Sequence, residues 1–222
     1  MVWDAVRTTL LLAICSTVVL LVIGTPLAWW LSRSRHWGAH VVGTVVSLPL
    51  VLPPTVLGFY LLIALGPKGP FAPILDLFGI RTLAFSFPGL VIGAVVHSLP
   101  FVVRPLQSGF ATLGNGPLEA AAMLRASPLD RFFTVAIPMV RHSFLSSATL
   151  GFTHAVGEFG VVLMIGGNIP GKTRVLSTAI FEQVEVMNYP AAHTMAGGIL
   201  LFSALVLFLL RLIGNRNGTG TP

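Results

Sequence analysis

The chain has few charged residues. Of its 222 residues, 13 are Lys or Arg and 7 are Asp or Glu, so only 9% carry a formal charge. A water-soluble domain has about 25% charged residues, which keep its surface hydrated. Hydrophobic residues make up 55% of the chain, and the mean hydropathy is +0.89. These values exclude a water-soluble enzyme and indicate an integral membrane protein.

Cysteine is almost absent as well. Cys15 is the only one, which excludes an intramolecular disulfide framework and a cysteine-based metal site. The sequence also shows no Ser/His/Asp set and no cluster of metal ligands, so we predict no catalytic residues, no resident metal and no cofactor in this chain. The net charge of +6 does not indicate nucleic-acid binding, because the basic residues are spread along the chain instead of forming one patch.

Long stretches without Asp, Glu, Lys or Arg determine the fold class. A transmembrane helix needs about 20 apolar residues, whereas a β-barrel shows many alternating segments of about 10. The sequence therefore predicts an all-α membrane protein. The first stretch ends in Trp29-Trp30 and is too long for a signal-peptide core, so we expect it to be retained. The predicted transmembrane domain is 1–213, with spans near 9–31, 41–65, 88–112, 143–165 and 190–212.

The basic residues predict the orientation, because cytoplasmic loops are enriched in Lys and Arg. Eight of them fall on one predicted face and five on the other. The first face carries Arg33, Arg35, Arg104, Arg125, Arg131, Arg141, Arg211 and Arg216, and the second carries Arg7, Lys68, Arg81, Lys172 and Arg174. We predict the N-terminus outside, the C-terminus in the cytoplasm, and a disordered cytoplasmic tail over 214–222. In the two long outer loops, 74–78 and 175–186 are expected to form short helices.

The inner segment 113–141 contains several helix signals. Gly116-Pro117 precedes a run of strong helix formers. Ser127 is a predicted N-cap, followed by Pro128, and Asp130 lies where the helix dipole favours an acid. Pro138 is expected to close the unit. We predict two short helices that form a stiff cytoplasmic knob; an amphipathic connector lying at the lipid interface is the alternative.

The spacing within this knob resembles the EAA loop of permease subunits of ATP-binding-cassette (ABC) importers. The similar elements are Glu119-Ala120-Ala121, position 125 and Val135-Ala136-Ile137-Pro138. The family usually has Gly where this chain has Arg125, and a left-handed conformation there would cost a non-glycine residue about 1 to 2 kcal/mol. The resemblance implies a coupling helix that seats in a cleft of a separate ATPase. The implied coupling residues are Glu119, Ala120, Ala121, Arg125, Ser127 and Pro138.

Further motifs resemble the permeases of molybdate importers. They are the segment 47–58 (SLPLVLPPTVLG), Ser98-Leu99-Pro100, Gly157-Glu158-Phe159-Gly160 and the segment 167–173 (GNIPGKT). The resemblance implies a type I permease core in a bacterial inner membrane. It also implies a homodimer, a dimer of ABC ATPase subunits that bind ATP and Mg²⁺, and an extracytoplasmic molybdate-binding protein. An ABC permease for sulfate, tungstate or another oxyanion is one alternative. A secondary transporter driven by an ion gradient is a second, less favoured alternative.

One motif formally matches a nucleotide site. Gly166, Gly171, Lys172 and Thr173 fit the phosphate-binding pattern G-x-x-x-x-G-K-[ST]. That chemistry requires a strand before the loop, but here a membrane span precedes it, and Pro170 removes one amide donor. We therefore predict that a partner chain binds ATP.

Polar and helix-breaking residues within the spans are candidates for a translocation path or gate. Glu158 would repel a dianion, so we interpret it as a gate or a packing hydrogen bonder, with an interfacial position as the alternative. Arg104 is either an attractive charge at the inner mouth or a side chain that reaches the headgroups. Prolines in the second and third spans are expected to interrupt the helices. The candidates are Pro53, Pro54, Ser98, Pro100, Arg104, Gly157 and Glu158, with Pro49 and Pro105 as further breaks and His97, Thr149, Thr153 and His154 as neutral donors.

Overall fold

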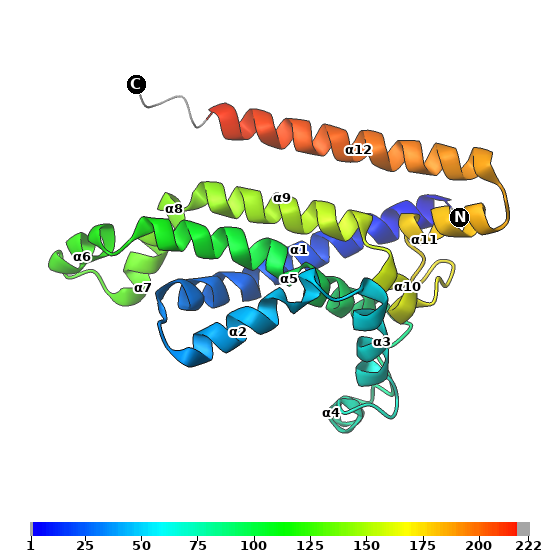
Figure 1. Cartoon of the computed structure of the whole chain (residues 1–222), viewed down its shortest axis with the longest axis horizontal. Helices are drawn as coiled ribbons and strands as arrows, with labels where there is room; N and C mark the ends of the chain where they lie inside the picture. Colours follow the sequence, from blue (N-terminus) through cyan, green and yellow to red (C-terminus); the bar gives the residue numbers. More distant parts are fainter. Residues whose placement is uncertain (1, 217–222) are drawn as a thin grey trace.

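The computed structural model describes residues 2–216, with side chains as far as residue 209. Within this range the secondary structure is helical and contains no strand, which confirms the all-α fold class. Figure 1 shows an elongated bundle whose long helices run roughly along one axis. The fold follows from the sequence, because a helix satisfies all of its backbone hydrogen bonds within one segment and can therefore cross lipid.

Five helical units in the described range have the length and composition of membrane spans when each bent pair counts as one. Three are continuous helices: α1 (Val2–Arg33), α5 (Phe87–Leu113) and α12 (Tyr189–Arg216). The second unit comprises α2 (Trp37–Ser47), the 3-10 turn η1 (Leu48–Leu50) and α3 (Pro54–Leu65). The fourth comprises α9 (Arg141–Gly157) and α10 (Gly160–Gly166). All five lie at the positions of the uncharged stretches.

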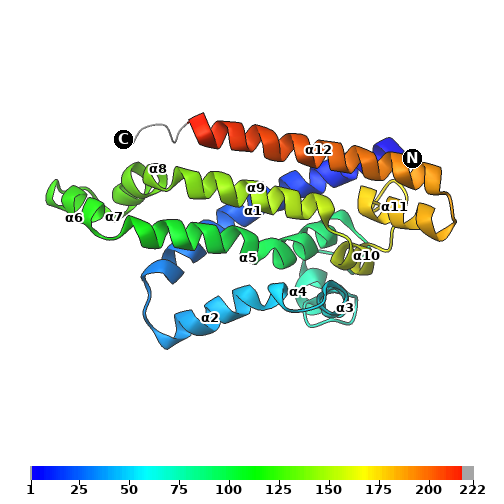
Figure 2. The ribbon, with the colours of Figure 1, turned by 45° about the horizontal axis from the view of Figure 1, so that its top comes forward.

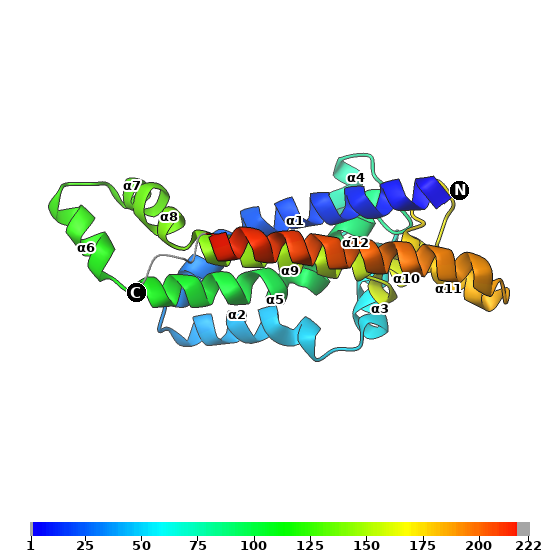
Figure 3. The same ribbon diagram turned by 90° about the horizontal axis from the view of Figure 1, so that it is seen from above.

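Short helices occupy the connections. At one end are α4 (Ala72–Leu77) and α11 (Leu176–Glu185), in the two loops where the sequence predicts short helices. At the other end the knob comprises α6 (Gly116–Met123), α7 (Pro128–Asp130), the π-helix η2 (Arg131–Ala136) and α8 (Ile137–Met139). Figure 3 shows this knob projecting from the end of the bundle opposite the N-terminus.

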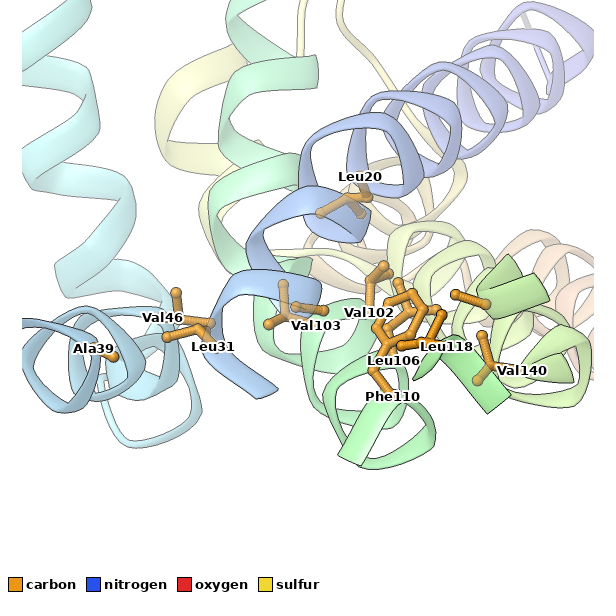
Figure 4. Packing of buried hydrophobic residues seen from close by; sticks show 12 residues of the cluster. Leu20, Leu31, Ala39, Val46, Val102, Val103, Leu106, Phe110, Leu118 and Val140 are labelled. Carbon is orange, nitrogen blue, oxygen red and sulfur yellow. The ribbon is translucent and has the colours of Figure 1, made fainter. Parts of the chain in front are cut away.

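The core lies where α1, α5 and α9 pack together. Leu20 of α1 and Val102, Val103 and Leu106 of α5 have no exposed surface. Figure 4 shows these side chains converging with residues of the knob. Next to them, the Trp29 ring of α1 contacts the rings of Phe110 in α5 and Phe132 in η2 edge to face, with centroid distances of 5.1 and 5.0 Å. The core thus continues from the bundle into the knob.

The outer helices have fewer neighbours. Figures 1 and 2 show α12 running along the α9 side of the bundle and α2 on the opposite side. Only 6% of the most apolar window of α12 is buried. Its exposed side chains include Leu200, Leu201, Leu205 and Phe208, which suit contact with lipid tails in a membrane span.

The second and fourth spans are sharply bent. The axes of the second span change direction by 112° between η1 and α3, and those of the fourth by 59° between α9 and α10. The first bend lies between Leu50 and Pro54, and its last residue, Pro53, and the first residue of α3, Pro54, lack backbone donors. The second bend, at Glu158 and Phe159, contains no proline, and sequence reasoning did not predict it.

Three details of the sequence prediction are wrong. Helix α5 continues through Pro100 and Pro105 without a break, because the neighbouring turns and the packed core keep the backbone helical. Pro138 does not close the knob but lies inside α8, and the chain turns after it at Val140. Helix α12 runs to Arg216, so it includes the first three residues of the predicted disordered tail, whose remaining residues 217–222 lie outside the described range.

Candidate functional site

A polar cluster lies inside the bundle where α5 faces the break between α9 and α10. Glu158 is 4% exposed, and its Oε2 atom lies 2.5 Å from Nδ1 of His97 on α5. Nδ1 of His154, one helical turn before Glu158, is 3.7 Å from the same oxygen. The hydroxyl of Ser98 lies 2.9 Å from that His154 nitrogen. Residues 97–98 and 154–158 therefore form one connected network.

Packing fixes the orientation of the His154 ring. The ring stacks on Phe101 with centroids 4.1 Å apart, and its centroid lies 4.9 Å from that of His97. Thr149 and Thr153, which we also predicted as donors along a path, instead donate to carbonyls of their own helix, those of Leu145 and Thr149. The polar cluster is thus restricted to His97, Ser98, His154 and Glu158.

Glu158 also stabilises the helix break itself. Its Oε1 atom accepts a hydrogen bond from the Val161 amide at 3.3 Å, which satisfies one of the free donors at the start of α10. The freed carbonyl of Glu158 accepts a hydrogen bond of 2.6 Å from the Ser177 hydroxyl on α11. The start of α11 is in turn bonded to α1, because the Leu176 amide donates to Oγ1 of Thr9 at 2.8 Å. Ser177 was not predicted, since nothing in its local sequence indicates this contact.

The two helix breaks meet in space. A Cβ atom added at Gly160 would lie 2.7 Å from Cβ of Pro54, and one added at Gly58 would lie 2.8 Å from Cβ of Met164. Only glycine allows helices α3 and α10 to approach this closely. Pro54, a predicted path residue of the second span, is therefore brought against Gly160 of the fourth span, two residues after the predicted Glu158.

The remaining candidates make no side-chain contact with the polar cluster that the structure records, although Gly157 adjoins Glu158 and Pro100 is two residues from Ser98. Arg104 is exposed on α5, and its guanidinium donates to Oγ of Ser47 at the end of α2. Pro53 and Gly157 are exposed, whereas Pro100 is buried in the bundle. The charge of Arg104 is thus used, within this chain, to join α5 to the second span near its bend.

The knob is firmly attached to the bundle. Arg33, at the end of α1, donates to Oδ1 of Asn115 at 2.8 Å and to the carbonyl of Gly114 at 3.2 Å. Its guanidinium also lies 4.0 Å from the centroid of the Trp29 ring. Leu118 of α6 is buried in the main core. Movement of α6 is therefore linked directly to α1 and α5.

The predicted coupling residues lie on the outer part of this knob. The Ser127 hydroxyl accepts a hydrogen bond from the Asp130 amide at 3.2 Å, as expected of an N-cap. Arg125 has a φ of 63°, the left-handed conformation in which glycine is favoured. Glu119, Ala120, Arg125, Ser127 and Pro138 are exposed, and Ala121 is half-buried.

The tip of the knob carries apolar side chains that our sequence reasoning missed. Met123 and Leu124 are 87% and 84% exposed, and Leu129 and Phe133 are also exposed. An exposed apolar patch with a polar rim is typical of a protein interface. The sequence contains the signal, because Met123 and Leu124 lie at the end of α6, Leu129 in α7 and Phe133 in η2, among polar residues such as Arg125, Ser127 and Asp130.

The loop that resembles a phosphate-binding motif has a different geometry. It follows helix α10, not a strand. The Thr173 hydroxyl is buried; it donates to the Gly166 carbonyl at 2.6 Å and accepts from the Ile169 amide at 3.0 Å. The loop is held to α11, because Asn168 and Arg174 both bind the Glu182 carboxylate. The threonine that would serve a nucleotide's metal ion is thus used to close the loop.

Comparison with known proteins agrees with this architecture. Residues 9–218 match the family of binding-protein-dependent transport system inner membrane components. The chain is 58% identical to the molybdenum transport system permease protein ModB of Azotobacter vinelandii, over 93% of this chain and 91% of the relative. It is 35% identical to the sulfate transport system permease protein CysT of Salmonella typhimurium, over 96% of this chain and 77% of the relative.

A solved structure shows the same fold. The permease-like chain of the inward-facing MetNI methionine ABC transporter superposes with a TM-score of 0.73 at 18% identity, covering 97% of this chain and 95% of the other. The predicted family resemblance is therefore confirmed, and so is the conclusion that this is a transport subunit rather than an enzyme. The chain is a multi-pass membrane protein that belongs to the family of inner membrane components of binding-protein-dependent transport systems.

Proposed function

We propose that the chain is the membrane subunit of an ATP-driven importer that moves molybdate into the cytoplasm. The observation that carries this proposal is the 58% identity to a molybdenum permease along nearly the whole of both chains. Identity to the sulfate permease is much lower, at 35%. The relatives are named for molybdenum and for sulfate transport; molybdate, tungstate and sulfate are all tetrahedral dianions, so sulfate or tungstate transport is the second candidate.

The knob supports a mechanism for coupling. An ATPase subunit, which binds ATP and Mg²⁺, would hold the exposed tip formed by Met123, Leu124 and their neighbours. ATP would draw two knobs together, and the attachment of Arg33 to Asn115 would transmit this movement to α1 and α5. Alternating access would follow, because ATP favours one of two conformations through differential contacts.

The assembly in this proposal contains two copies of the chain, two ATPase subunits and a molybdate-binding protein on the outer side. The knob carries Arg125 and Arg131, and the basic residues near it predict that this end faces the cytoplasm. The N-terminus, at the opposite end of the bundle (Figure 1), would then face outward.

Glu158 has a structural part in this mechanism. A carboxylate on the path would repel a dianion, whereas here it holds the start of α10 and binds His97. We infer that Glu158 keeps α10 in place beside α3 as the conformations alternate. Glu158→Gln should therefore slow uptake; unchanged uptake would refute this role.

The proposal is tested by ATPase activity of the reconstituted complex with its binding protein, titrated separately with molybdate, tungstate and sulfate. We expect stimulation by molybdate, and its loss when Glu119 and Ala121 on the knob are both substituted. Ser108→Ala, an exposed substitution away from the knob tip, serves as the control. Stimulation by sulfate alone would favour the second candidate, and failure to copurify with any ATPase would exclude an ABC importer.

A further inference from the structure

Three potential metal ligands converge within the bundle. One ligand atom from each of His97, His154 and Glu158 lies within 4.8 Å of the other two. Nδ1 of His97 and Nδ1 of His154 face the same carboxylate oxygen, Oε2 of Glu158, at 2.5 and 3.7 Å. His154 and Glu158 are four residues apart at the end of α9, and the packing of α5 against α9 brings His97 to them.

The Glu158 carboxylate lacks a permanent positive partner among the described residues. Its side chain is 2% exposed, and its ion pairs are with His97 and His154. A neutral imidazole supplies a hydrogen bond but no charge. A buried carboxylate is costly unless a cation compensates it. A cation bound between these groups would meet this requirement.

We propose that His97, His154 and Glu158 bind a divalent transition-metal ion, with Zn²⁺ as the best match. Two imidazoles and one carboxylate are a ligand set typical of Zn²⁺. With bonds of about 2.0 to 2.2 Å in tetrahedral geometry, ligand atoms lie about 3.4 Å apart. The distance of 3.7 Å between His154 and Glu158 already fits. His97 would move away from the carboxylate by somewhat less than 1 Å, exchanging its hydrogen bond for a metal bond.

The surroundings suit such a site. The stack on Phe101 fixes the His154 ring, which reduces the cost of ordering that ligand. On metal binding, Nδ1 of His154 would exchange the Ser98 hydroxyl, now 2.9 Å away, for the ion, and that hydroxyl would be free to bind a metal-bound water. The His154 side chain is 23% exposed, against 10% for His97, so an ion can approach from the His154 side.

A metal ion bound at this site would affect the bend between α9 and α10. The three ligands connect α5 to both sides of the bend between α9 and α10, which Glu158 already stabilises. A bound ion would hold these segments together and oppose any change in the bend. This inference does not depend on the identity of the transported anion, because it concerns only side chains of this chain.

The test is Zn²⁺ titration of the nucleotide-free transporter complex by calorimetry, with an affinity tag that contains no histidine. Binding of Co²⁺ to the same sample, followed by its visible spectrum, reports the ligand geometry. We expect one ion per permease chain and tetrahedral cobalt bands. His97→Gln and His154→Gln should each weaken binding at least about 100-fold, since even the loss of an outer-shell partner costs 10 to 100-fold.

The matched control is His142→Gln, an exposed histidine on the same helix as His154. It should bind the metal like the wild type. Copurification of the ATPase with each variant shows that the chain has folded. Equal affinity in the wild type and in the double variant His97→Gln/His154→Gln would overturn the proposal, as would cobalt bands that persist in that variant.

Discussion

The break before α3 and the break before α10 are stabilised by different interactions. The bend of 112° before α3 ends at two consecutive prolines, Pro53 and Pro54, so its cause is local. The bend of 59° before α10 has no proline, and its free backbone groups are satisfied by Glu158 and by Ser177 from another helix. One break therefore depends on backbone chemistry, and the other depends on tertiary contacts.

This difference explains which parts of the molecule can change shape. At Pro53 and Pro54 the missing donors cannot be restored, and both prolines are exposed, so they lack the packed neighbours that keep α5 helical at the buried Pro100. A break held by side-chain hydrogen bonds can open or straighten when its partners move. The bend at Glu158 is thus the better position for movement, and the contact between Gly160 and Pro54 would pass that movement to the rigid break.

The largest expected loss of stability is at the break between α9 and α10, which Glu158 holds. Glu158→Ala removes the bond to His97 and the cap on α10, and we expect a loss of about 3 kcal/mol in the free energy of unfolding, because two hydrogen bonds to a buried carboxylate are lost. The measurement is the thermal unfolding midpoint of the purified protein. Glu185→Ala, on the exposed side of α11, is the control. Equal midpoints for the two variants would show that the polar network does not hold the break.

The contact between the two breaks is the next to test. Gly160→Ala places a methyl group 2.7 Å from Cβ of Pro54. Overpacking of this kind costs about 1 to 3 kcal/mol, so the unfolding midpoint should fall. Gly197→Ala provides the comparison, because a Cβ there meets nothing within 4 Å. If both variants behave alike, the two breaks are not in close contact.

The Ser177 hydrogen bond should have a smaller effect. Ser177→Ala leaves the Glu158 carbonyl without its partner from α11, which we expect to lower stability by about 1 kcal/mol. Ser108→Ala, at an exposed position on α5, should have no comparable effect on the unfolding midpoint. If the unfolding midpoint of Ser177→Ala is as high as that of the control, the contact from α11 does not stabilise the break at Glu158.

The smallest effect is expected at the proline break. Pro53→Ala leaves Pro54 at the start of α3, so the bend should remain. The change increases the freedom of the unfolded chain and should cost about 0.5 kcal/mol, measured by the same unfolding midpoint. A loss as large as that of Glu158→Ala would mean that Pro53 itself holds the second span in shape.

Features that depend on local sequence could be predicted, and features that depend on contacts between helices could not. Low charge and uncharged stretches predicted five spans and the all-α class, because lipid imposes length and polarity directly on the sequence. Ser127 was identified as an N-cap, since capping depends on neighbours within three residues. The breaks at Pro53 and Pro54 followed from the missing donors. Continuity of α5 through Pro100 was not predicted, because the surrounding helices decide it.

The polar cluster was beyond sequence reasoning. His154 and Glu158 are four residues apart, but His97, the third potential ligand, is 61 residues from Glu158, and no local pattern connects it to them. We therefore predicted no metal-ligand cluster, whereas the fold places three potential ligands together. The role of Ser177 was missed for the same reason. Spacing along one helix identifies neighbours within that helix, but contacts between spans require the packed structure.

The central claim is that this subunit imports molybdate, and uptake tests it most directly. Proteoliposomes would contain the permease with its ATPase, ATP inside, and the binding protein with labelled molybdate outside. We expect ATP-dependent accumulation that excess unlabelled molybdate abolishes and an equal excess of sulfate leaves largely intact. Accumulation of labelled sulfate but not molybdate, or uptake that does not require ATP, would contradict the account.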